Sequence, residues 1–242
     1  MKISYAVMTH ESRLELAEWV AGELERMGAP RALVCVDSTG NGSWAAANQA
    51  WRCFQSDSTH HAVFQEDIAF GRNFMQGLRN AIACRPFDVL SFFAPTIEAE
   101  RANEAGASWI ESRYYVSGQA VCFPVPLLKR FLKWQAEYIL PSYPSDDGRI
   151  DLFCETHEQP IYTTNPSFVE HLQAVEVGGR GPFGSVLNHT FPRSARVFGP
   201  FLDLGKVRLR EGLRKPYLHR YSRRKRLKGV AYERPLQPTT RS

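Results

Sequence analysis

The chain has 242 residues, 43% of them hydrophobic and 12% aromatic, so it can bury one substantial core and is not disordered throughout. No apolar stretch approaches the roughly 20 residues of a membrane-spanning helix, and acidic and hydroxyl residues come too early for a signal peptide. Five widely spaced cysteines without a CxxC pair disfavour a zinc site and are typical of reduced core thiols. We therefore expect a cytoplasmic protein with no transmembrane segment.

The formal net charge of +5 is unevenly distributed. Residues 206–242 carry 13 of the 30 Lys and Arg residues but only 2 of the 25 Asp and Glu residues, so residues 1–205 are acidic overall. An acidic body with a concentrated cationic segment indicates a polyanionic partner. We predict a folded domain over residues 1–205 and a basic C-terminal tail over residues 206–242.

Strand and helix patterns alternate in the first part of the chain. Residues 32–36 form a continuous apolar run, as expected of a strand buried on both faces. Ser12 and Glu15 have the spacing of a capping box, and Gly28 ends the helix that they begin. The predicted strands are 3–7, 32–36, 61–65 and 89–93, and the helices between them are 12–27, 43–54 and 72–84. This order predicts an α/β fold, with a Rossmann-like, mostly parallel sheet flanked by helices and right-handed crossovers.

The second part of the chain has a less regular pattern. Residues 97–107 are predicted to be helical or irregular, and a turn-rich loop over residues 141–149 delivers Asp146 and Asp147 to the start of a helix. The further predictions are a strand over 114–123, a helix over 126–139, a short strand over 161–163, and a segment over 166–172 that follows it.

Polar residues lie where several predicted strands end. His10 follows the first strand, Asp37 the second, and Gln65-Glu66-Asp67 the third. The carboxyl ends of parallel strands gather along one edge of a sheet, so these residues are expected to converge there. Carboxylates suit Mg²⁺ or Mn²⁺, and such an ion can neutralise a diphosphate leaving group. The alternative for Asp37 is a turn-forming role.

Two common phosphate-binding motifs are absent from the sequence. No GxGxxG follows the first strand, which disfavours an ordinary dinucleotide-binding fold, and no GxxxxGK[ST] occurs, which excludes a P-loop ATPase. A phosphate must therefore be held by a metal or by basic side chains. Arg13, one turn beyond His10, can supply such a cation to a nucleotide, although an exposed helix arginine is the ordinary alternative.

Three short motifs together resemble those of a known family. Residues 61–67 (HAVFQED), Asp146-Asp147 and residues 166–171 (PSFVEH) follow one another as in GT-A glycosyltransferases, in particular phage-type members with a QDD strand end and a PSLVxH segment. The resemblance covers roughly residues 1–200. It implies a GT-A-like fold and a sugar transferase that uses a nucleoside-diphosphate donor, here a UDP-sugar, with Mn²⁺ or Mg²⁺.

The resemblance implies a role for each residue of the donor site. Asp67 resembles the last acid of the DXD motif, which binds the metal, and His171 resembles the late histidine that completes the metal site; a structural histidine is the alternative. Gln65 stands where the first acid contacts the donor ribose, and as an uncharged residue it departs from the pattern. Glu66 assists Asp67. The implied nucleotide contacts are completed by His10, Arg13, Asp37 and Trp44.

The resemblance also implies a catalytic acid pair. Asp146 and Asp147 resemble the acids that begin the acceptor-side helix, where inverting enzymes place the base that takes a proton from the acceptor hydroxyl. We favour Asp147 as the base and Asp146 as a cap or sugar contact. An aspartate at a helix start is also a common capping residue.

The basic tail indicates a nucleic acid rather than a membrane. Residues 206–228 hold eleven Lys and Arg residues and one acid, with Tyr217, His219 and Tyr221 between them. Cations neutralise phosphates and aromatic rings stack on bases, whereas no long apolar face accompanies the charges. The predicted nucleic-acid contacts are Arg214, Lys215, Arg220, Arg223, Arg224, Lys225, Arg226 and Lys228.

Domain and tail together suggest a metal-dependent enzyme that transfers a sugar, with glucose as the first expectation, from a UDP-sugar to 5-hydroxymethylcytosine or 5-hydroxymethyluracil in DNA. A phage-encoded enzyme of this kind would act in the cytoplasm of an infected bacterium. Two alternatives remain: a GT-A enzyme that modifies a surface glycan or protein, and a non-catalytic nucleic-acid-binding protein on a degenerate transferase fold. The sequence does not indicate the oligomeric state.

Overall fold

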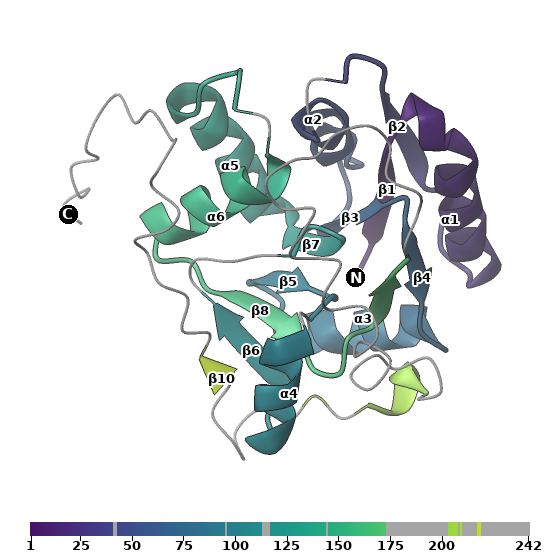
Figure 1. Cartoon of the computed structure of the whole chain (residues 1–242), viewed down its shortest axis with the longest axis vertical. Coiled ribbons are helices and arrows are strands. Elements are labelled where there is room, and N and C mark those ends of the chain that lie inside the picture. Colours follow the sequence, from purple (N-terminus) through teal and green to yellow (C-terminus); the bar gives the residue numbers. More distant parts are fainter. Residues whose placement is uncertain are drawn as a thin grey trace.

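The computed structural model describes residues 1–40, 43–94, 96–112, 117–143, 145–172, 203–207, 209 and 217–218. These residues form two sheets and the helices that cover them (Figure 1). None of the described helices combines the length and the hydropathy that a bilayer crossing requires.

The main sheet contains most of the strands. They are β1 (Ile3–His10), β2 (Leu33–Asp37), β3 (His60–Gln65), β5 (Val89–Ser91), β6 (Trp109–Ser112), β7 (Ala120–Pro124), β8 (Ile161–Thr164) and β10 (Tyr217–Leu218). Their order is β10-β6-β8-β5-β7-β3-β1-β2. β1, β2, β3, β5 and β8 are parallel, whereas β6, β7 and β10 run the opposite way. The predicted α/β fold with a mostly parallel sheet is confirmed.

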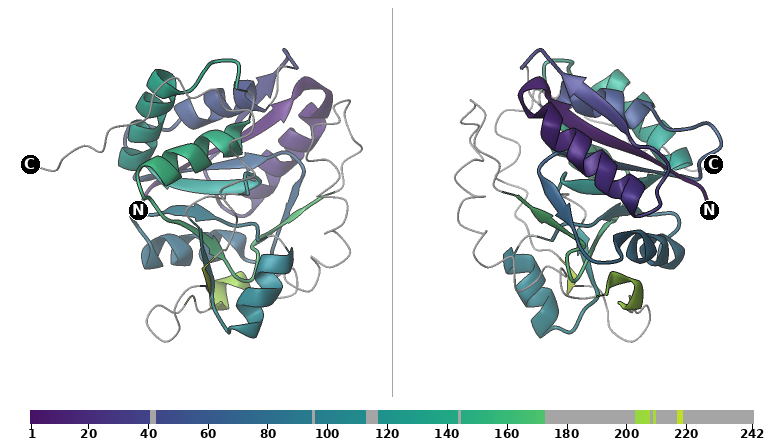
Figure 2. Two further views of the ribbon diagram at one scale, coloured as in Figure 1. Left: turned by 60° about the vertical axis from the view of Figure 1, so that its left-hand side comes forward. Right: turned by 90° about the vertical axis from the view of Figure 1, so that its right-hand side faces the viewer.

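Helices cover both faces of this sheet (Figure 2). They are α1 (Leu14–Arg26), α2 (Trp44–Arg52), α3 (Phe74–Cys84), α4 (Thr96–Glu104), α5 (Val125–Tyr138) and α6 (Asp146–Thr156). α1 and α3 pack on one face, and α2, α5 and α6 pack on the other. β1 contributes to both cores because its side chains alternate: Tyr5 and Val7 face α1 and α3, whereas Ala6 and Met8 face α2.

A second, two-stranded sheet joins distant parts of the chain. β4 (Ile68–Phe70) pairs antiparallel with β9 (Val169–His171), and Ile68 lies opposite His171. The sequence pattern predicts no strand for residues 169–171, because three residues are too few for a periodic signal. This pairing brings a late segment of the chain to the end of β3.

Two local predictions differ from the structure. The strand predicted over residues 114–123 begins only at Ala120, and a separate strand, β6, precedes it; residues 113–116 lie outside the described residues. The capping box is wrong. A short 3-10 helix over Glu11–Arg13 follows β1, its cap is His10, and the Ser12 backbone N–H donates to His10 Nδ1. α1 begins afterwards, so Ser12 is too early to cap it.

Candidate functional site

The candidate site lies at the carboxyl ends of β1, β2 and β3. His10 is the register partner of Asp37, and Gln65 lies opposite Met8. The chain leaves β1 for β2 on one side and returns to β3 on the other, so the carboxyl ends of β1 and β3 flank a topological switch point, where open α/β sheets bind ligands. The expected convergence of the strand-end residues is therefore present.

An ionic cluster occupies one side of this switch point. Arg13 Nη1 donates to Glu66 Oε1 at 2.8 Å and to Asp67 Oδ2 at 3.1 Å. His171 Nε2 lies 3.0 Å from Asp67 Oδ2. The pairing of β4 with β9 is what holds His171 here, since its register partner Ile68 directly follows Asp67. Asp67 and His171 were predicted to act together although 104 positions separate them, and the fold brings them into contact.

Both carboxylates of this cluster are buried, which makes their ionised forms less favourable than in water. Glu66 and Asp67 are each 8% exposed. Burial, and then the charge of Asp67, raise the pKa of Glu66 despite its hydrogen bond with Arg13. Asp67 Oδ1 is buried and has no hydrogen-bond partner among the described residues. A buried carboxylate oxygen in that state is costly unless a ligand satisfies it.

The donor chemistry fits a divalent ion that is only partly held by protein. The described residues contain no group of three or more His, Cys, Asp or Glu side chains able to hold a metal. Mg²⁺, however, is often bound through one or two carboxylates while water and substrate phosphates complete an octahedron at 2.0–2.1 Å, in which neighbouring ligands lie about 3 Å apart. Asp67 Oδ2 and His171 Nε2 are 3.0 Å apart. This spacing, which is also that of their direct ion pair, leaves room for both side chains as ligands of one ion.

Asp146 lies on the α2 side of the sheet, at the start of α6. It is 4% exposed, and its Oδ1 accepts a hydrogen bond of 2.6 Å from Ser43 Oγ, just before α2. Burial, and then the charge of Asp147, raise the pKa of Asp146 to about 6. A Cβ on Gly118 would lie 3.4 Å from Asp146 Oδ2 and 3.5 Å from Gln65 Nε2. Asp146 and Gln65 therefore both border the space beside Gly118 that a larger residue would fill.

Asp147 has a different environment from Asp146. Its Oδ1 accepts from the Gly148 backbone N–H at 2.7 Å and from Ser145 Oγ. The residue that caps α6 is Ser145, whose Oγ accepts from the Gly148 N–H at 3.0 Å. Asp146 is therefore not the cap of α6. Asp147 accepts a backbone hydrogen bond in the first turn of this helix.

A buried arginine holds the loop that leads to Asp146. Arg149 is 1% exposed and donates hydrogen bonds to the carbonyl oxygens of Leu140, Pro141 and Tyr143. Its guanidinium carbon also lies 4.3 Å from the centre of the Trp44 ring. Burial lowers the pKa of Arg149 to about 10. Trp44, predicted to contact the donor base, packs on this arginine, and no sequence pattern indicated the pair.

The remaining predicted donor contacts have local partners. Asp37 Oδ1 accepts from the Thr39 backbone N–H at 2.7 Å and from Thr39 Oγ1 at 2.6 Å, as a turn-forming aspartate does. Burial is the largest influence on the Asp37 carboxyl and raises its pKa, but these hydrogen bonds and the charge of His10 bring the net shift below the usual value. His10 Nδ1 lies 2.8 Å from Ser12 Oγ.

The predicted tail begins within the packed domain. Val207 packs against the core and Leu209 is buried in it, and Cys84 Sγ donates to the Leu209 carbonyl oxygen at 3.4 Å. β10 pairs with β6 at the edge of the main sheet. The predicted nucleic-acid contacts lie outside the described residues; they are Arg214, Lys215, Arg220, Arg223, Arg224, Lys225, Arg226 and Lys228.

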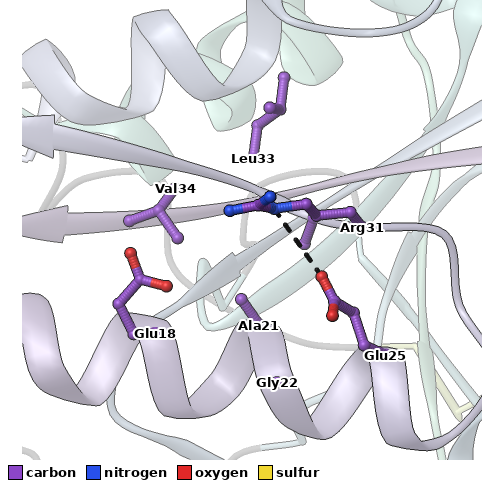
Figure 3. Close-up of a pocket in the computed structure, with 8 residues that line it drawn as sticks. Glu18, Ala21, Gly22, Glu25, Arg31, Leu33 and Val34 are labelled. Atoms are coloured by element: carbon purple, nitrogen blue, oxygen red, sulfur yellow. Dashed lines mark ion pairs between the residues drawn. The ribbon is translucent and has the colours of Figure 1, made fainter.

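A pocket of about 680 Å³ lies apart from this site, between α1 and the first residues of β2 (Figure 3). Arg31 and Glu25 form an ion pair of 3.9 Å across it. Leu33 and Val34 are at the amino end of β2, whereas the candidate site is at the carboxyl ends. The lining residues are Glu18, Ala21, Gly22, Glu25, Arg31, Ala32, Leu33 and Val34.

Comparisons with known proteins do not identify a family. No protein-family model and no curated protein matches the chain. Among solved structures, the inositol-1-phosphate CTP transferase from T. maritima is similar with a TM-score of 0.39 and 9% sequence identity, over 80% of this chain and 77% of that chain. This similarity is too weak to indicate an activity. The α/β assignment rests on the strand order of the main sheet.

Proposed function

We propose that the chain is a glycosyltransferase that binds a UDP-sugar at the switch point with a divalent metal, Mn²⁺ or Mg²⁺, held by Asp67 and His171. The observation that carries this proposal is the 3.0 Å contact between Asp67 and His171, together with the buried Asp67 Oδ1 that has no partner among the described residues. The metal would supply positive charge to the diphosphate as it leaves.

Four nearby side chains support the binding of a nucleotide-sugar. Arg13 carries a cation at the same edge, within 3.1 Å of Asp67, and can act on a phosphate oxygen as well. Gln65 presents an amide nitrogen on the α2 side, a group suited to a ribose or sugar hydroxyl. His10 and Asp37 end the two adjoining strands and can orient the nucleoside.

We further propose Asp146 rather than Asp147 as the base. In the reaction, the acceptor hydroxyl oxygen bonds to the anomeric carbon, the bond from that carbon to the diphosphate oxygen breaks, and Asp146 takes the hydroxyl proton. A pKa of about 6 leaves Asp146 ionised at neutral pH yet close enough to accept a proton efficiently. Asp147 Oδ1 is already engaged by Gly148 and Ser145.

The proposed acceptor is a hydroxymethylated pyrimidine in DNA. The support is compositional: 11 of the residues from 206 to 228 are Lys or Arg. A hydroxymethyl group provides the nucleophile that an ordinary base lacks, and it projects into the major groove. A surface glycan or protein is the alternative acceptor for the same donor site.

A non-catalytic role has one specific observation in its favour. Arg13 already pairs with both Glu66 and Asp67, so a guanidinium occupies part of the position where an active transferase needs a metal. A protein that binds nucleic acid on such a site would not hydrolyse UDP-sugars in the presence of Mn²⁺. Measured hydrolysis therefore separates the two functions.

The test is incubation with a panel of UDP-sugars, Mn²⁺ and DNA containing 5-hydroxymethylcytosine or 5-hydroxymethyluracil, followed by mass spectrometry of the nucleosides. We expect the mass of one hexose to be added, and we expect Asp67→Asn to abolish the addition. The matched control is Asp57→Asn, which removes an exposed carboxylate near the amino end of β3. No sugar mass on either DNA contradicts the proposed acceptor, and no UDP-sugar hydrolysis with any acceptor contradicts the enzyme.

A further inference from the structure

A buried amide with an unused oxygen lies beside the candidate site. Gln119 is 8% exposed, and its Oε1 is buried without a hydrogen-bond partner among the described residues. An amide oxygen accepts hydrogen bonds only, so it requires a donor. Leaving a buried acceptor unsatisfied is costly, and a bound ligand that supplies the donor removes that cost.

Backbone pairing places Gln119 directly across from Gln65 of the candidate site. Phe64 of β3 is paired with Ala120 of β7, and the Gln65 backbone N–H donates to the Gln119 carbonyl oxygen at 2.9 Å, so Gln119 lies opposite Gln65. Val63 and Val121 belong to the core under α2, α5 and α6. Alternation along β3 therefore puts Gln65 on that face, and Gln119, in the turn just before β7, lies across from it. Directly opposed residues have Cβ atoms about 5 Å apart.

The neighbours of this pair are polar, and we call Gln65, Gln119 and Asp146 the polar niche. Gly118 directly precedes Gln119, and a Cβ on Gly118 would touch both Asp146 Oδ2 and Gln65 Nε2. Asp146 is in turn fixed by Ser43. The niche therefore offers an amide donor from Gln65, an amide acceptor from Gln119 and a carboxylate from Asp146. Mixed donors and acceptors of this kind match the hydroxyl groups of a sugar.

Distance along the sheet decides which part of a ligand reaches Gln119. β2, β1, β3 and β7 are consecutive, so Asp37 and Gln119 are three strand spacings, about 14 Å, apart across the sheet, and the strand registers offset them by two further residues. A UDP-sugar with its nucleoside at β1 and β2 and its diphosphate near Asp67 has only its sugar left to place beside β7. The proposed base, Asp146, is at that same end.

We propose that Gln119 is a specificity-determining residue whose Oε1 accepts a hydrogen bond from one hydroxyl of the transferred sugar. This inference rests on the proposed function, because it requires a UDP-sugar in the site. Gln119 then selects among sugars that differ at one hydroxyl and contributes nothing to the affinity for UDP itself.

The test is a binding cycle with UDP, a UDP-hexose and its monodeoxy analogues, measured by calorimetry with Mn²⁺. In the wild type, removal of one particular hydroxyl is expected to weaken binding about fivefold, the effect of one hydrogen bond. In Gln119→Met, which keeps the length of the side chain, that penalty should disappear while UDP affinity stays unchanged. The matched control, Gln159→Met, alters a part-buried amide far along the chain and should keep the penalty.

A second variant covers the case in which Gln119→Met does not fold. Gln119→Asn keeps the amide but withdraws its oxygen by one methylene, so the deoxy penalty should fall below the wild-type value. Deoxy penalties equal to those of the wild type in the folded Gln119 variants overturn the assignment. If the wild type binds neither UDP nor any UDP-sugar, the proposed function itself has failed, and that result is distinct from an unchanged penalty.

Discussion

Asp146 combines a buried environment with the charge that its proposed role as a base requires. Its pKa is raised from 3.8 to about 6 by burial and by Asp147, so ionisation is unfavourable in the folded state compared with the unfolded chain. The stability that follows from its neutral form is fully present below pH 4 and is lost as the pH rises through 6. Carboxylates whose pKa is shifted by burial and a neighbouring acid are common at functional sites.

The variant Asp146→Asn tests this directly. Asn keeps an oxygen that accepts from Ser43 but does not titrate, so the variant should gain stability relative to the wild type as the pH rises from 4 to 7, by roughly 1–3 kcal/mol. Urea unfolding at each pH gives the free energy of unfolding. Parallel pH profiles for the two proteins would show that Asp146 does not titrate in this range. Sugar transfer should be lost in the same variant.

His61 predicts the opposite pH dependence. It is fully buried, its Nε2 donates to the Ala50 carbonyl oxygen at 2.8 Å and its Nδ1 accepts from Ser4 Oγ at 2.8 Å, so the ring is held neutral. Burial lowers its pKa from 6.5 to about 4. The stability contributed by the neutral ring is present above pH 6.5 and is lost as the pH falls toward 4.

His61→Asn removes the titrating ring. The variant should be less stable than the wild type at pH 7 by about 1–3 kcal/mol, because a buried ring and its hydrogen bonds are lost. The difference should shrink as the pH falls from 6.5 to 4, since only the wild type must then protonate. Urea unfolding monitored by circular dichroism measures it. A difference that stays constant with pH would assign the acid sensitivity to other groups.

At the scale of elements, two helical glycines predict opposite effects of the same substitution. A Cβ on Gly77 of α3 would lie 3.0 Å from Leu204 Cβ and 3.1 Å from Phe168, whereas a Cβ on Gly22 of α1 would meet nothing within 4 Å. Gly77→Ala should therefore destabilise by about 1–3 kcal/mol through overpacking. Gly22→Ala should stabilise by up to about 1 kcal/mol through helix propensity. Denaturant midpoints of both variants check the pair, and a stabilised Gly77→Ala would mean that Leu204 does not pack on α3.

The elements that the sequence predicted well are those with a strong local signal. The apolar runs 32–36 and 62–64 were correctly predicted as strands and give β2 and β3. Burial on both faces was wrong for residues 32–36, because β2 is the edge strand of the main sheet and Leu33 is 52% exposed. The short strand β9 has no such signal, because its stability comes from pairing with β4 and from Phe168 and Val169 in the core. The start of α1 was misplaced because the end of β1 is followed by a 3-10 turn whose cap is His10.

The candidate site shows the same division. Asp67 and His171 were predicted as a pair from the resemblance of their motifs, and the fold brings them into contact. Gln119 was missed, since a glutamine before an apolar run is unremarkable until its partner strand is known. Arg149 was missed for the same reason, because its carbonyl partners at residues 140–143 are defined only by the folded loop.

At the scale of the whole molecule, the packing of residues 203–209 predicts the outcome of truncation. A chain that ends at residue 205 loses Val207 and Leu209 from the core and should be destabilised by about 2–4 kcal/mol. A chain that ends at residue 218 keeps these contacts and β10, and should unfold like the full chain. Thermal unfolding of the two truncations measures this. Equal stability of both would place the domain boundary at 205.

The same truncation at residue 218 bears on the proposed nucleic-acid partner. It removes Arg220 and the later predicted contacts, whose charges would release counterions from DNA. DNA affinity and its dependence on salt should both fall, while hydrolysis of UDP-sugars persists. An unchanged salt dependence would locate DNA binding elsewhere on the protein.

Arg13 gives the proposed metal site its own counterion. One guanidinium faces two carboxylates, so the cluster holds a single formal negative charge before any ligand arrives. The domain should consequently fold without metal, and EDTA should leave its melting temperature unchanged, in contrast to a structural zinc domain. Mn²⁺ alone should bind this cluster weakly, because Arg13 already neutralises one carboxylate. The negative charges of bound UDP should make the binding of Mn²⁺ favourable. Metal and nucleotide should then bind as linked ligands, each tightening the other by the same factor, which calorimetric titration of Mn²⁺ with and without UDP would reveal.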